Sequence, residues 1–223
     1  MSVVREVALL LWKDVVVELR AKELLFGTVF FGAILVLIFA FAFYGGERPP
    51  VDVMSGVLWV AIALSGTLAI GRAFEREREG NTLRALLLAP ISRSSLYLSK
   101  LIAIALLMAI VELVVAVLLS FMLHASLIEH VLSLAALLLL GTVGFGAVAS
   151  LFGAALGRAR SRDVLLPLLV YPLSVPVLIA GTRATTALLL GEDASFWLKF
   201  LLVYDAIFIS IGVWVFEPVA VSE

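Results

Sequence analysis

The chain has 223 residues, of which 63% are hydrophobic and only 15% are charged, and its formal net charge is −1. Soluble domains have about 25% charged residues, so this composition excludes an ordinary water-soluble fold and predicts an integral membrane protein. Cysteine is absent from the sequence, which excludes disulfides, thiolate metal sites and thioether attachment of a prosthetic group.

Residues 1–23 are predicted to form a helix that lies along the membrane surface. Apolar residues alternate with charged ones, and most of the charges fall within about a third of a helical wheel at about 100° per residue. Asp14, Glu18 and Lys22 widen this polar face. Such a pattern is typical of an interfacial amphipathic helix. The clustered charges are Arg5, Glu6, Lys13, Arg20 and Glu23.

Six long apolar runs follow, and each is close to the roughly 20 residues that a helix needs to cross about 30 Å of hydrocarbon. Only the third and the sixth contain a charge, at Glu112 and Asp205. The sequence therefore predicts an all-α integral membrane protein with six transmembrane helices, folded as one transmembrane domain over residues 1–223. The predicted spans are about 24–44, 53–71, 101–123, 131–157, 164–182 and 200–216.

Basic residues are distributed unequally between the gaps that separate these spans. Thirteen of the sixteen Lys and Arg residues lie in the N-terminal segment and in the gaps after the second and fourth spans. The other three are Arg48, Arg183 and Lys199. Since basic loops stay in the cytoplasm, we predict that both termini are cytoplasmic.

The longest gap between spans, residues 72–100, is predicted to be a structured cytoplasmic loop. Its charges alternate in sign from Glu75 to Glu79 and must be solvated or paired with another protein. Gly80 and Asn81 then break the helix, and Pro90 ends a second, short helix that has one apolar face. That face is formed by Leu83, Leu86 and Leu87.

The sequence contains no phosphate-binding loop, zinc motif or catalytic triad, so we expect no catalytic, cofactor-binding or metal residues. The energy for any work would then come from a partner or from an ion gradient. Glu112 lies in the middle of its span, where a carboxylate is unfavourable by several kcal/mol unless it is protonated or paired. It either belongs to a proton or substrate path or is a hydrogen-bonded residue inside the bundle. Asp205, nearer the outer interface, poses the same question at a smaller energetic cost.

Three prolines, Pro167, Pro172 and Pro176, lie in the fifth span. Each removes a backbone donor and leaves a carbonyl that another helix, water or substrate must satisfy. We therefore expect a broken or kinked helix, which serves either a moving, gating role or packing alone.

Two segments resemble known transporters. EREGNTLRALLLAPISRSSLYLSK resembles the cytoplasmic loop of ABC-2 type transporter permeases, although the family often has an acidic residue at the position of Arg84. RDVLLPLLVYPLSVPVLIAGTRAT resembles a narrower branch, the haem exporter protein B family of cytochrome c maturation permeases. The patterns LPL, YP and VPVLI-x-G of that family match 166–168, 171–172 and 175–181, and the resemblance covers nearly the whole chain.

The resemblance implies a non-catalytic membrane subunit in the bacterial inner membrane, driven by a separate ATP-binding subunit that hydrolyses ATP. The short helix near Leu83 would be a coupling helix seated in a groove on that ATPase. Further implied partners are a membrane subunit that handles haem, a small subunit of the same complex, a periplasmic haem chaperone and a second copy of this chain. Haem would be a substrate of the complex and not a bound cofactor, and no nucleic acid would be involved. The implied coupling residues are Leu83, Arg84, Leu86, Leu87, Glu75, Glu77 and Glu79.

Two other interpretations remain open. One is an ABC-2 exporter of a lipid, a polysaccharide or a drug, which would require a lateral or central cavity. The other is a non-transporting scaffold or a gradient-driven carrier, which should not activate a soluble ATPase. His124 and His130 fall in a predicted outer loop and are either haem ligands or solvated residues.

Overall fold

The computed structural model describes residues 3–46, 49–79, 91–123, 127, 130–156 and 161–221. These residues form α-helices and short connections, with no β-strand among them. The helices are α1 (Val3–Ala21), α2 (Glu23–Ala42), α3 (Val51–Glu79), α5 (Arg93–Met122), α6 (Val131–Ala155), α7 (Arg162–Leu190) and α8 (Ser195–Val221).

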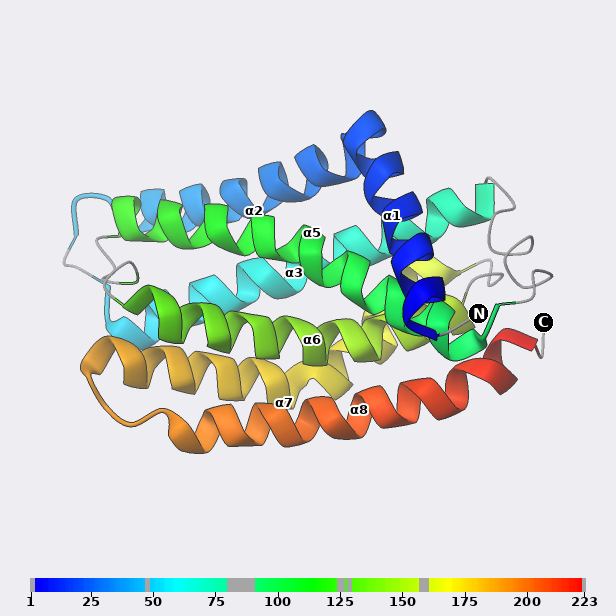
Figure 1. The fold of residues 1–223 in the computed structure, drawn as a ribbon. Coiled ribbons are helices and arrows are strands. Elements are labelled where there is room, and N and C mark those ends of the chain that lie inside the picture. The colour runs from blue at the N-terminus through cyan, green and yellow to red at the C-terminus, as the bar shows by residue number, and fades with distance from the viewer. Residues whose placement is uncertain are drawn as a thin grey trace.

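Six of these helices, α2 to α8, are long and apolar enough to cross a membrane. Figure 1 shows them side by side along one long axis, with α1 crossing the bundle at the end where both termini lie. The predicted fold class, an all-α membrane protein with six spans, is confirmed. The peripheral helices differ from the central ones in burial, since 67% of the most apolar stretch of α3 is buried but only 22% of that of α2 or α8.

Several helices extend well beyond the apolar runs. The third spanning helix, α5, begins at Arg93 and not at residue 101, and α3 continues to Glu79 instead of ending near residue 71. Hydropathy marks only the part of a helix that lies in hydrocarbon, whereas helical hydrogen bonding continues where charged side chains reach water. Ser92 caps the start of α5, because its side chain accepts a hydrogen bond from the Ser95 N–H at 3.2 Å.

The first helix places Glu6 against the bundle and leaves several large apolar residues outside. Glu6 and Leu10 are buried, whereas Leu9, Trp12 and Leu19 are exposed. A left-handed residue, Lys22 with φ 57°, ends α1 and turns the chain into α2. An apolar outer face fits a helix that lies in the membrane interface, where that face contacts lipid.

The centre of the bundle is organised around one tryptophan. Trp59 of α3 is 2% exposed, and its indole N–H donates to the Thr185 hydroxyl of α7 at 2.9 Å. The ring lies directly against Gly141 of α6 and Gly181 of α7, so that a Cβ atom at either glycine would overlap it. These glycines let three helices approach one large side chain. Position 181 is also the final glycine of the proline-rich motif.

A second aromatic residue joins the helices nearer the end that carries the termini. Tyr97 of α5 is fully buried, and its hydroxyl donates to the Ala147 carbonyl of α6 at 3.2 Å. Its ring packs on Phe216 of α8 with 5.5 Å between centroids, and Gly212 provides the space beside it. The start of α5 is therefore fixed to both α6 and α8.

Candidate functional site

The predicted coupling face falls on a part of the chain that the structure does not describe. Leu83, Arg84, Leu86 and Leu87 lie outside the described residues, whereas positions 75, 77 and 79 belong to the end of α3. The described helices on either side of the segment, α3 and α5, nevertheless place its two ends. Both ends lie at the end of the bundle that α1 crosses (Figure 1).

A polar joint connects α1 to α5 directly after this segment. The Glu6 carboxylate accepts hydrogen bonds from the Ser92 backbone N–H and the Ser92 hydroxyl, both at 3.1 Å. Two turns further along each helix, the Lys100 ammonium pairs with Asp14 at 2.7 Å. Both contacts join residues 86 positions apart, so α1 follows the first turns of α5 in a fixed register. We call these four residues the α1–α5 joint.

The contacts of the α1–α5 joint lower the pKa of Glu6. The hydrogen bond from the Ser92 backbone N–H favours the ionised carboxylate, and this lowers the pKa of Glu6 below its ordinary value. A lowered folded-state pKa stabilises the joint above the unfolded value of about 4.3, and this contribution is lost as the pH falls through the folded value.

Replacing Glu6 with glutamine should therefore flatten the acid end of the stability profile. The native chain should lose thermal stability on acidification below about pH 4.3, and Glu6→Gln should lose less, because its amide does not titrate. Thermal unfolding of the purified full chain in detergent between pH 7 and pH 3 measures this difference. Equal losses in both proteins would show that the Glu6 contact contributes nothing.

Glu112 lies inside the bundle and has a partner. It is 4% exposed, and the Thr142 hydroxyl of α6 donates to its Oε1 atom. The contact connects the middle of α5 to the middle of α6, so the carboxyl group faces the bundle and not lipid. This geometry corresponds to the hydrogen-bonded alternative of the sequence analysis, and it leaves the question of a proton or substrate path to experiment.

Two substitutions separate the hydrogen bond from the charge. Thr142→Val should destabilise the chain by about 1–3 kcal/mol, because it leaves a buried acceptor without its donor. Glu112→Gln should be close to neutral for folding, because its amide oxygen still accepts from Thr142. Thermal unfolding in detergent measures both.

Asp205 lies on the other side of α6, and it differs from Glu112 in its lack of a partner. It is 6% exposed, and neither carboxyl oxygen has a hydrogen-bond partner among the described residues. Its Oδ1 atom lies against Gly144 of α6, where a Cβ atom would overlap it. The structure buries this carboxyl between helices, and its position nearer the outer interface stays a prediction. An ionised group there would lack any compensating contact.

The prolines of the fifth span lie within one helix. Pro167, Pro172 and Pro176 are all inside α7, which is assigned as uninterrupted from Arg162 to Leu190. The expectation of a broken helix is thus wrong, and a kink remains a prediction. The Tyr204 hydroxyl of α8 donates to the Leu173 carbonyl at 2.7 Å, and this contact joins α8 to the proline-containing part of α7.

No metal site that includes His130 is found among the described residues. His124 is outside the described residues, and His130 is half-buried just before α6. Across the described part of the chain, no group of three His, Cys, Asp or Glu residues is placed to hold a metal ion. Haem ligation by these histidines stays a prediction.

Comparison with known proteins decides the family. Residues 5–222 match the family described as CcmB protein. The chain belongs to the CcmB protein family. A CcmB relative from Pseudomonas aeruginosa, named Heme exporter protein B, is 30% identical over 184 residues, which cover 79% of this chain and 78% of the relative. The resemblance to this family is thereby confirmed. Gly181, the last residue of the proline-rich motif, has a physical role there, because the Trp59 ring packs directly against it.

Sequence reasoning missed the α1–α5 joint of this CcmB family member, although all four residues were visible as polar groups. The spacing from Glu6 to Asp14 equals that from Ser92 to Lys100, and this equality was the available signal. A single sequence offers many such equal spacings, so the pairing needed the structure.

Proposed function

We propose that this chain is the membrane permease subunit of an ATP-driven complex for cytochrome c biogenesis. The observation that carries the proposal is membership of the CcmB family over residues 5–222, supported by the relative named Heme exporter protein B. Haem is the substrate of the complex. A separate subunit hydrolyses ATP, and the cycle delivers haem or releases the haem-loaded periplasmic chaperone.

The arrangement of helices suggests how force from the ATPase enters the bundle. Residues 80–90 connect the charged end of α3 to the start of α5, and the α1–α5 joint lies next to that start. An ATPase that displaces this segment would move the ends of α1, α3 and α5 together. Tyr97 and Glu112 then connect α5 to α6, so the motion would repack the spans as rigid bodies and not as a chemical step.

We also propose that the end with both termini faces the cytoplasm of a bacterial inner membrane. The proposal rests on the bias of basic residues in the sequence and on the common location of the termini in Figure 1. Cysteines introduced at the exposed positions Ser161 and Glu192 of this cysteine-free chain test it. A membrane-impermeant thiol reagent should label position 192 and not 161 in intact cells, and the reverse pattern would invert the topology.

The function itself is tested by purification from the native membrane in mild detergent. We expect a soluble ATPase and a second multi-span, haem-binding subunit to copurify, and we expect loss of this chain to abolish maturation of c-type cytochromes. Copurification without an ATPase would instead support a scaffold or a gradient-driven carrier.

Export of a lipid or a drug is the second candidate function. An exporter requires a lateral or central cavity, and the structure has a cavity of about 770 Å³ between α1, α2, α3 and α5. Normal c-type cytochromes in cells that lack this chain would favour the exporter, and their loss would favour the proposed function.

A further inference from the structure

One cavity opens between the surface helix α1 and three membrane spans, α2, α3 and α5. Its volume is about 770 Å³, within the range of roughly 300–1,000 Å³ that is typical of small-molecule sites. All four helices contribute apolar residues to the wall, and small residues such as Ala69 of α3 and Ala103 of α5 leave space between them. Leu106 and Ile110 are exposed along its side, so the cavity opens towards the surface that faces lipid.

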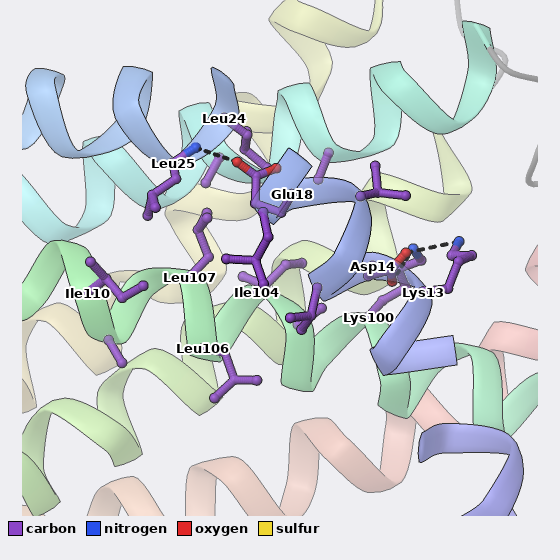
Figure 2. A pocket seen from close by; sticks show the side chains of 17 residues that line it. Lys13, Asp14, Glu18, Leu24, Leu25, Lys100, Ile104, Leu106, Leu107 and Ile110 are labelled. Carbon is purple, nitrogen blue, oxygen red and sulfur yellow. Dashed lines mark hydrogen bonds and ion pairs between the residues drawn. The ribbon is translucent and has the colours of Figure 1, made fainter. Parts of the chain in front are cut away.

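The charged residues of the cavity are confined to α1 and the start of α5. Figure 2 shows Lys13, Asp14 and Lys100 together at one end and Ile110 at the other. Asp14 pairs with Lys13 at 2.9 Å and with Lys100 at 2.7 Å. Glu18 is engaged by α2, because its Oε1 atom accepts the Leu25 N–H at 2.8 Å. The cavity is thus amphipathic along its length.

The order of charged and apolar residues along the cavity matches the order of groups in a lipid molecule. The charged lining residues belong to α1 and the start of α5, at the end of the bundle that α1 crosses (Figure 1), whereas α2 and α3 contribute only apolar residues to the lining. A lipid molecule has the same order of groups, with its phosphate at the interface and its acyl chains in the hydrocarbon. An empty apolar space of this size would sacrifice dispersion contacts, and water would lack polar partners in its apolar part.

We propose that the cavity binds one phospholipid from the leaflet on the side of the termini, with an acyl chain in the apolar part and its phosphate beside Lys13. The Lys13 side chain pairs with Asp14 and is 34% exposed, and its positive charge suits a phosphate. Haem is a poor occupant, because none of the described residues that line the cavity is a His, Met, Cys or Tyr that could bind iron. The lipid fills the space between α1 and α5, independently of the haem pathway.

Native mass spectrometry of the purified full chain with dioleoylphosphatidylglycerol tests the site. One lipid should remain bound per native chain. Ala103→Trp and Ala109→Trp, which fill the cavity from two positions, should lower lipid retention about tenfold. Ala206→Trp on the exposed face of α8 is the matched control and should retain lipid like the native chain. Thermal unfolding verifies that each variant is folded. If one tryptophan variant does not fold, the other still tests the cavity.

The headgroup contact has its own comparison. Lys13→Gln should weaken retention of phosphatidylglycerol about fivefold and leave retention of dioleoylglycerol, which has no phosphate, unchanged. Undiminished lipid retention in both folded tryptophan variants would overturn the proposal. Displacement of the lipid by an equal concentration of haem would also overturn it and assign the cavity to haem. Since all measurements use the chain without its ATPase, failure of this proposal leaves the proposed function standing.

Discussion

Replacing Gly181 with alanine should destabilise the fold by about 1–3 kcal/mol, as inserting a methyl group into a filled core commonly does. The added Cβ atom would overlap the buried ring of Trp59. That ring has little freedom to retreat, because Gly141 confines it from α6 and its indole N–H is bonded to Thr185. Thermal unfolding in detergent or bicelles measures the effect on the full chain.

Gly56→Ala is the matched control for this substitution. Gly56 lies in α3, the helix that carries Trp59, and a Cβ atom there would meet nothing within 4 Å. Alanine is favoured over glycine in a helix by about 0.5–1 kcal/mol, so the control should be neutral or stabilising. In a Trp59→Phe background the cost of Gly181→Ala should shrink, since the smaller ring leaves room and the two effects are coupled. Equal midpoints for Gly181→Ala and Gly56→Ala would disprove the packing argument.

Leu86→Asp should weaken association with the ATPase by more than about 2 kcal/mol, the size of effect found at the central residues of protein interfaces. The reason is that a carboxylate on the apolar face of the proposed coupling helix would lose its water without gaining a partner. The variant should still insert and fold, because residue 86 lies outside the six spanning helices. Copurification with the ATPase and maturation of c-type cytochromes are the two measurements.

The control for this change is Ser161→Asp, at an exposed position just before α7. It adds the same charge and should leave ATPase binding unchanged, because Asp is well tolerated at the start of a helix. Ser94 is less suitable, since it is half-buried in the first turn of α5. If Leu86→Asp retains the full complement of ATPase and normal haem attachment, the coupling face has been misplaced.

The sequence predicted the six spans well because the membrane imposes the constraint directly. Hydrocarbon demands a long uncharged helix, and composition alone reveals such a helix. Hydropathy did not predict the full extent of α5, since residues 93–100 are largely polar and precede the apolar run although they are helical.

The candidate site was less predictable, because its properties depend on partners that are distant in sequence. Hydropathy singled out Glu112 and Asp205 as charges in apolar runs and distinguished them only by their depth in the span. The structure distinguishes them by their partners, because it gives Glu112 a hydroxyl donor and leaves Asp205 without one among the described residues. The same holds for Trp59, since its two glycines come from different helices and no spacing within one helix could connect them.

The register of the α1–α5 joint has a consequence for biosynthesis. Glu6 and Asp14 bind partners that follow them by 86 residues, and at about 5–20 residues per second this separation takes a ribosome roughly 4–17 s to translate. During that interval α1 has neither Ser92 nor Lys100 to bind, and its exposed apolar residues favour the membrane surface. The nascent α1 should therefore wait at the lipid interface until the third span has been inserted, and only then assume its final position.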